Sequence, residues 1–111
     1  MKNKEEIKKI LYSRGYTTVF KALNNVLEVN EALLFGMLIS KDSYWDSRDN
    51  KRTDYFYDTI EGTKKDTGLS GFQSRKAIKG LMEKELIFHY TGGIPRKRYF
   101  KINYIKLNEL L

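Results

Sequence analysis

The sequence contains no cysteine, and this absence excludes several kinds of site. Without cysteine there are no disulfides and no zinc or redox sites that depend on a thiolate. The chain also has a single histidine, His89, which without a second histidine or a cysteine is a poor nucleus for a metal site. We therefore expect His89 on the surface of a strand. The lack of cysteine also fits a cytosolic protein.

Long apolar runs and leader-like segments are missing too. No run of 18 apolar residues occurs, so we expect no membrane span. The N-terminal MKNKEEIKKILYSRG is positively charged but lacks an apolar core and a small-residue cleavage site, so we expect no signal peptide. No glycine-rich phosphate loop, nucleophile elbow or catalytic triad is present. We expect a cytoplasmic protein without enzyme activity, cofactor or small-molecule substrate.

Aspartates are concentrated in the segment KDSYWDSRDNKRTDYFYD, where they stand at positions 42, 46, 49, 54 and 58. Clustered carboxylates can bind Mg²⁺ or Ca²⁺. Their spacing does not match an EF-hand loop, and basic residues lie between them, so we interpret most of the segment as a solvated loop without a metal. Tyr44 and Trp45 within it either anchor the loop on the core or form a surface for a partner.

The positive charge of the chain is concentrated in its last two-fifths. The 111 residues carry a net charge of +7. Residues 70–111 hold nine Lys/Arg and three Asp/Glu, a net +6, whereas residues 1–69 hold twelve basic and eleven acidic residues, a net +1. This asymmetry favours nucleic acid as a partner over a membrane, because no basic amphipathic helix with an aromatic face is seen. The alternative is a basic protein without a polyanionic partner.

Apolar periodicity predicts two helices in the first half of the chain. We expect an N-terminal helix within 1–15, ended by Gly15, and an extended piece or short strand over 16–20. A central, largely buried helix is expected within 30–43, capped by Asn30 and apolar on almost all sides. A polar loop should follow, and YFY at 55–57 is typical of a short strand.

The second half predicts two helices and a hairpin. Over 59–84, a short helix, a turn at Gly68 and a longer helix capped by Ser70 form a helix-turn-helix. Strand-like segments flank TGGIPRK and predict a hairpin over 86–104. A final helix over 105–111 can pack its leucines onto the domain. The fold class is therefore α+β and mainly helical, and the order is that of a single winged helix-turn-helix domain with a two-stranded wing.

A helical wheel of the longer helix separates a buried stripe from a basic face. The stripe spans about 100° and comprises Ser74, Ala77, Ile78 and Leu81. The opposite face comprises Phe72, Arg75, Lys76, Lys79 and Glu83. Small residues at the start of the stripe let a second helix approach closely, as a helix-turn-helix requires. Phe72 should therefore be exposed in the free protein.

The start of this helix is the candidate DNA-contacting surface, because recognition helices touch base edges with their first residues. Its candidate residues are Ser70, Gly71, Phe72, Gln73, Arg75, Lys76 and Lys79. Arg75 suits a guanine or a phosphate, Gln73 suits an adenine or water, and Phe72 suits a thymine methyl or packing against a nearby segment. The alternative for the basic side chains is a solvated helix face.

The hairpin tip carries a second basic group, formed by Arg96, Lys97 and Arg98 beside the Gly-Gly pair. Winged helices commonly place such a tip against the DNA backbone or minor groove. Two basic groups about 20 residues apart, one on the helix and one on the hairpin expected to contact DNA, are a more specific signal for DNA binding than either alone. Pro95 should stiffen the tip and limit pairing at the sheet edge.

These segments resemble a known family. GLSGFQSRKAIKGLMEKELI followed by GGIPRKRYFKIN is similar to the winged helix of replication proteins from Gram-positive plasmids, phages and related mobile elements. The upstream YTTVFKALN, NEALLFGMLIS and YFYDTIEGTKKDTGLS fit as well, so the resemblance spans about 16–104. Glu85 departs from it, since such sequences often have glycine there. The resemblance implies a DNA-binding domain that in initiators recognises origin repeats, often as a dimer.

Three functions follow from these observations. The first is sequence-specific binding of double-stranded DNA in replication initiation or its control. The second is transcriptional regulation with the same fold, and the third is a winged-helix adaptor that binds protein instead of DNA. A homodimer could form through the N-terminal helix or the apolar C-terminal tail.

Overall fold

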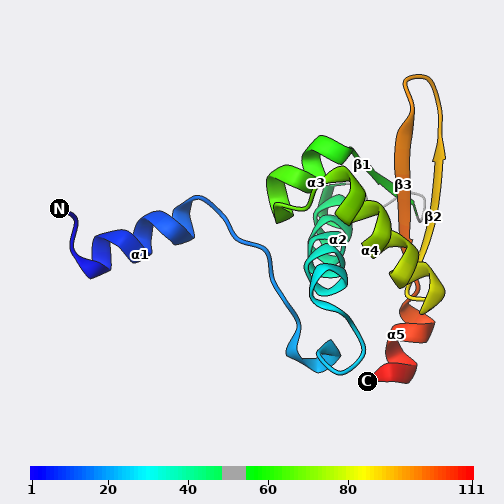
Figure 1. Ribbon diagram of the computed structural model, residues 1–111, viewed down its shortest axis with the longest axis horizontal. Helices are drawn as coiled ribbons and strands as arrows, with labels where there is room; N and C mark the ends of the chain where they lie inside the picture. Colours follow the sequence, from blue (N-terminus) through cyan, green and yellow to red (C-terminus); the bar gives the residue numbers. More distant parts are fainter. Residues whose placement is uncertain (49–54) are drawn as a thin grey trace.

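The computed structural model describes residues 1–48 and 55–111 and has a mainly helical α+β architecture (Figure 1). Its elements are α1 (Lys4–Ser13), η1 (Lys21–Leu23), α2 (Val29–Arg48), β1 (Phe56–Asp58), α3 (Ile60–Thr67), α4 (Gly71–Glu83), β2 (Ile87–Gly92), β3 (Lys97–Ile102) and α5 (Tyr104–Leu110). The three strands form one antiparallel sheet in the order β1-β3-β2. The predicted α+β class and the C-terminal hairpin are confirmed, and β1 adds a third strand beside β3.

The core lies between the inner face of the sheet and helices α2 and α4. Both helices contact the sheet, and α3 packs against both of them. The inward residues of β3, Phe100 and Ile102, are buried together with Leu34, Leu38 and Leu81 of the two helices. Burying several large apolar side chains at about 1.5–3 kcal/mol each is what fixes α4 relative to the hairpin.

Helix α2 starts earlier than Asn30, the residue predicted to cap it. The backbone N–H of Glu28 donates to Oε1 of Glu31 at 3.0 Å, and the N–H of Ala32 donates to the Glu28 carbonyl at 2.8 Å. Glu28 therefore precedes the helix, and Asn30 lies inside its first turn. The choice of Asn30 is wrong because the Glu31 side chain, reaching back to the helix start, supplies the cap.

Helix α2 also continues to Arg48, so the loop predicted after the central helix is wrong over 44–48. Tertiary contacts hold this polar end in place. The buried carboxylate of Asp42 accepts a hydrogen bond from the Tyr104 hydroxyl of α5 at 2.5 Å. Trp45 packs against the core, which is one of the two roles expected for it. The aspartates at 49 and 54 lie outside the described residues.

Helices α3 and α4 and the turn between them form where their capping residues predict. Thr59 precedes α3, and its hydroxyl accepts from the N–H of Gly62 at 2.9 Å. Helix α3 ends at Gly68, whose φ of 78° is the left-handed conformation that favours glycine. Ser70 then caps α4 in a capping box with Gln73. These local bonds set the turn between the two helices.

The hairpin of β2 and β3 and the C-terminal helix α5 follow α4 in the chain. In Figure 1 the tip between β2 and β3 extends beyond the helices. Glu85, just before β2, has a φ of 62°, so this residue occupies a left-handed position of the kind that favours glycine. Leu107 and Leu110 pack against the core from α5 as expected. Leu111 does not, because its side chain is 75% exposed.

The N-terminal segment meets the body of the molecule only through an extended arm. Residues 16–20 are neither helix nor strand. The arm lies directly on α2 at Gly36, where an added Cβ would stand 1.7 Å from the Thr18 carbonyl oxygen. Helix α1 has no buried residue and projects away from the rest of the chain (Figure 1). The predicted helix at 1–15 is confirmed.

Candidate nucleic-acid interface

Helix α4 presents the faces that its wheel predicts. Its four buried residues are Ser74, Ala77, Ile78 and Leu81, the predicted stripe. Phe72 is 70% exposed, so that prediction is also confirmed. Gly80 brings α4 close to α2, because an added Cβ would lie 1.9 Å from Oε2 of Glu31. Small residues on α4 therefore let it pack closely against α2, and Phe72 at its start faces outward.

An open groove of about 760 Å³ lies between α4 and the hairpin. The cationic side chains on the helix side are Arg75 and Lys79, and those on the hairpin side are Arg96, Lys97 and the buried Arg98. One carboxylate, that of Glu61 from α3, also lines the groove. Two basic elements separated in the sequence are therefore brought to the two sides of one groove. Ile78 and Met82 supply an apolar floor.

Lys76 lies away from this groove. Its side chain borders a second hollow with Glu28, Glu31 and Lys84, between α2 and α4. Lys79 lines both hollows. Of the three basic residues predicted on α4, the groove therefore brings together two, and Lys76 stands beside acidic side chains.

Arg98 is the largest departure from the expected basic tip, because it is only 7% exposed. Its guanidinium points inward, where Nη1 donates to Oγ of Ser74 at 3.2 Å and Nη2 donates to Oγ1 of Thr63 at 2.6 Å. In this arrangement Arg98 is not presented for the expected contact with DNA, since its Nη groups are bonded inside the protein and its buried Nε has no hydrogen-bond partner within the described residues. The sequence did hold a signal: period-two alternation puts Arg98 on the same face as Phe100.

The buried guanidinium is balanced by a carboxylate. Asp58 stands opposite Arg98 in the pairing of β1 with β3, and its Oδ2 accepts a hydrogen bond from Thr63 at 2.7 Å. Burial lowers the pKa of Arg98, the charge of Asp58 opposes this, and the charge of Arg75 lowers the pKa further. Because an arginine stays protonated under all ordinary conditions, Arg98 acts as a fixed link between β3, α3 and α4.

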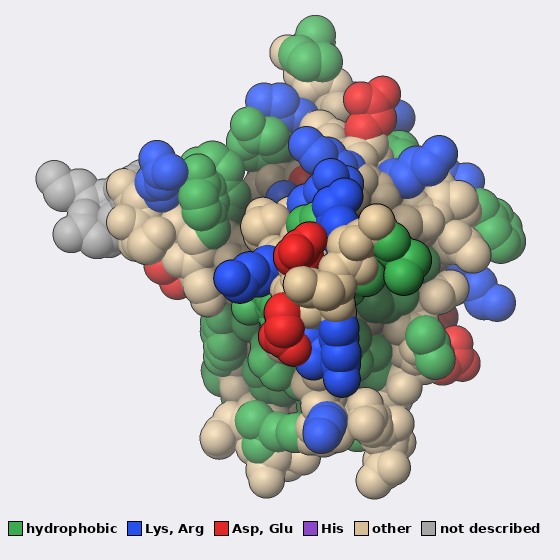
Figure 2. All heavy atoms as spheres, turned by 90° about the vertical axis from the view of Figure 1, so that its left-hand side faces the viewer, with side chains coloured by type: hydrophobic (Ala, Val, Ile, Leu, Met, Phe, Trp, Pro, Cys, Tyr) green, Lys and Arg blue, Asp and Glu red, His purple; other side chains and the backbone are tan. Residues whose placement is uncertain are grey.

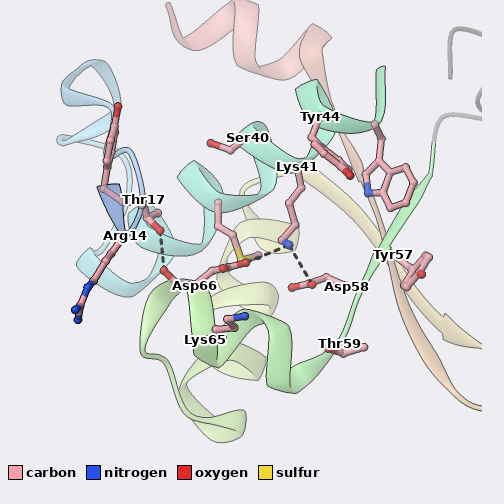
Figure 3. Close-up of a pocket in the computed structure, with 14 residues that line it drawn as sticks. Arg14, Thr17, Ser40, Lys41, Tyr44, Tyr57, Asp58, Thr59, Lys65 and Asp66 are labelled. Atoms are coloured by element: carbon pink, nitrogen blue, oxygen red, sulfur yellow. Dashed lines mark hydrogen bonds and ion pairs between the residues drawn. The ribbon is translucent and has the colours of Figure 1, made fainter. Parts of the chain in front are cut away.

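The polar network extends to a cleft on the side of α2 and the N-terminal arm (Figure 3). Lys41 of α2 reaches Asp58 at 3.5 Å and Asp66 at 3.1 Å. Burial by itself lowers the pKa of Lys41, but hydrogen bonds and charges from Asp66 and Asp58 outweigh it and raise that pKa. Thr17 of the arm donates to the Asp66 carbonyl at 2.7 Å. The two ion pairs of Lys41 therefore join α2 to β1 and α3, and the hydrogen bond of Thr17 joins the arm to α3.

His89 lines the groove, although the sequence marked it only as a strand-surface residue. Its ring stacks on Phe100, with centroids 4.7 Å apart, and its Nδ1 lies 2.9 Å from the Tyr99 carbonyl oxygen. Burial lowers the pKa of His89; the bond to Tyr99 opposes this, and the charge of Arg98 adds to the lowering. His89 is therefore held mainly neutral beside a basic groove.

Gln73 and Phe72 occupy different positions at the start of α4. Oε1 of Gln73 accepts from the N–H of Ser70 at 2.9 Å, so its side chain is used in the capping box. Gln73 can therefore contact a base only by sharing or breaking its hydrogen bond with Ser70. Phe72 is exposed, and Gly71 leaves room for the Arg75 guanidinium, whose Nη1 would lie 3.3 Å from an added Cβ.

One face of the molecule, the side toward which α1 projects, is shown in Figure 2, and Lys and Arg side chains predominate there over Asp and Glu. Over residues 1–48 and 55–111, no cluster of three or more potential metal ligands was found. Within the same ranges, no helix is both long and apolar enough to cross a membrane. Comparison of the chain with protein-family models, curated proteins and solved structures found no match.

Proposed function

We propose that this chain is a winged helix-turn-helix protein that binds double-stranded DNA sequence-specifically. The observation that carries the proposal is the groove lined from one side by Arg75 and Lys79 and from the other by Arg96 and Lys97. A duplex offers phosphates on both sides of each of its grooves. Cations on a helix and on a projecting hairpin can therefore neutralise the backbone on both flanks of one contact.

The start of α4 supplies groups that can read bases. Its first turn is exposed at Phe72, an apolar side chain that suits a thymine methyl in the major groove. Arg75 follows one turn later and has the planar fork that pairs with guanine O6 and N7. The N-terminal end of α4 at Gly71 favours a phosphate. Specificity would therefore come from α4, and most of the salt dependence from α4 and the hairpin together.

Arg98 has a different part in this proposal. It joins the hairpin to both helices through Ser74 and Thr63 and so fixes the width of the groove. A buried arginine of this kind positions the DNA-contacting side chains without touching DNA. We assign the chain to replication initiation or its control on a plasmid, phage or mobile element, on the strength of the sequence resemblance alone.

The test begins with selection of bound sequences from a pool of random duplexes. Affinity for the selected site is then measured over a range of salt concentrations, for wild type and for two double variants, Arg75→Ala/Lys79→Ala and Arg96→Ala/Lys97→Ala. Each phosphate contact contributes about −0.9 to the slope of log K against log salt, so each double variant should flatten the slope by up to about 2. Arg75→Ala should also relax base preference at one position, by about 1–3 kcal/mol.

The matched control is Lys21→Ala/Lys106→Ala, which removes the same charge from η1 and α5, outside the groove. This variant should keep the wild-type slope. Equal loss of affinity in all three double variants would mean that net charge, not the groove, drives binding. No duplex binding at low salt would favour the adaptor, and a selected site over promoters would favour transcriptional control.

A further inference from the structure

The outer face of the sheet has an unusual composition. Alternation along the strands turns Phe56, Phe100 and Ile102 into the core. The residues that alternation turns outward are Tyr57, Phe88, Tyr90, Gly92, Lys97, Tyr99 and Lys101. Apart from the glycine, every one is aromatic or a lysine. Of the strand residues that the structure describes on this face, none is aliphatic and none carries a carboxylate.

The aromatic rings of this face form a continuous row across all three strands. Tyr57, Tyr99 and Tyr90 stand opposite one another in the strand register. Ring centroids lie 6.4 Å apart for Tyr57 and Tyr99, and 4.8 Å apart for Tyr99 and Tyr90, which are nearly parallel. The ring of Tyr55, the residue before β1, lies 5.1 Å from that of Tyr90, and the ring of Trp45 lies 6.1 Å from that of Tyr57.

These rings are held in position and remain accessible. Tyr57, Phe88 and Tyr90 are 39%, 44% and 48% exposed. The ammonium group of Lys97 lies 4.3 Å from the centre of the Tyr57 ring, and that of Lys101 lies 5.7 Å from the centre of the Phe88 ring. Cross-strand aromatic pairs stabilise a sheet. Sheet stability does not require three large rings to stay this exposed beside two cations.

We propose that this face binds single-stranded nucleic acid, with unpaired bases stacked on the exposed rings and phosphates beside the lysines. Aromatic rings stack on any base, and lysines supply the charge that tracks a backbone, which together make a sequence-tolerant surface. The absence of aliphatic residues from the outward strand positions, together with the positive charge, argues for a polyanion carrying π-faces over an apolar protein partner. A duplex fits poorly, because its bases are already stacked on one another and expose only their edges.

This surface is separate from the groove of the proposed function, although Lys97 borders both. A chain with both surfaces would hold a duplex by α4 and the hairpin and take up an unpaired strand on the outer face of the sheet. The second activity does not require the first, so each can fail alone.

The experiment measures binding of a fluorescein-labelled 12-nucleotide oligo-dT by anisotropy, together with quenching of Trp45, the single tryptophan, by unlabelled oligo-dT. Tyr90→Leu and Phe88→Leu remove a ring but keep apolar bulk, and each should weaken binding by about 5- to 150-fold. Tyr90→Phe keeps the ring and should bind within about twofold of wild type. Circular dichroism of each variant establishes that it is folded.

A parallel measurement of duplex binding by the same variants separates this proposal from the proposed function. Arg75→Ala/Lys79→Ala should lose duplex affinity and keep oligo-dT affinity, whereas Tyr90→Leu should do the reverse. The proposal is overturned if wild type neither binds oligo-dT nor shows quenching. It is equally overturned if both folded leucine variants bind as wild type does, or if they change self-association in sedimentation and leave oligo-dT binding intact.

Discussion

The contact between α2 and α4 at Gly80 leads to a prediction in which a helix-favouring substitution is harmful. In an unobstructed helix interior, Gly→Ala stabilises by about 0.5–1 kcal/mol. At Gly80 the new methyl carbon would stand 1.9 Å from Oε2 of Glu31 and 2.9 Å from its Cδ, far inside contact distance. The Glu31 carboxylate would therefore have to leave its position.

Leaving that position has a cost, because the Glu31 carboxylate is buried and would lose two partners. Its Oε1 accepts from the N–H of Glu28 and pairs with the ammonium group of Lys84. Hydrogen bonds of a charged group contribute about 1.5–3 kcal/mol. Subtracting the helix gain, we expect Gly80→Ala to lower the free energy of unfolding by about 0.5–2.5 kcal/mol.

A double-mutant cycle tests the cause directly. Glu31→Ala removes the obstructing carboxylate, so in that background Gly80→Ala should regain its intrinsic stabilisation of about 0.5–1 kcal/mol. Urea unfolding followed by circular dichroism gives the four free energies, and the sign of the Gly80→Ala effect should reverse between backgrounds. Stabilisation by Gly80→Ala with Glu31 present would refute the close approach of the two helices.

Three further perturbations are predicted. Glu85→Gly should raise the free energy of unfolding by about 0.5–1 kcal/mol, because φ is 62° there, whereas Glu85→Ala should not; urea titrations compare them. Gly36→Ala forces the new methyl against the Thr18 carbonyl and should destabilise by about 1–3 kcal/mol, with faster trypsin cleavage at Arg14 and Lys21, which flank the displaced arm. The pKa of His89 is lowered from 6.5, so the unfolded chain binds more protons and stability should fall as pH drops below about 6.5; thermal melts between pH 7 and 5 should show this dependence diminished in His89→Gln.

Much of the candidate interface could be predicted because it depends on neighbours along one helix. The cap at Ser70, the buried stripe through Ala77 and the outward position of Phe72 follow from a fixed rise and rotation per residue. The two basic elements could also be found by reading charges along the chain. Charge along the chain could not show which cations are exposed in the groove: Lys76 borders another hollow and Arg98 is buried, although both carry the same charge as Arg75.

The elements from α3 to β3 could be predicted from caps, turns and periodicity that act within a few residues. The burial of Arg98 is visible only in the tertiary structure, because it requires Thr63 of α3 and Ser74 of α4 to converge on β3. The tertiary structure also decided the length of α2, whose polar end is held by a residue 62 positions away in the chain. The aromatic row has the same origin: its rings meet only when the strand register is set. Local patterns fix elements, while contacts between distant residues fix which side chains face outward.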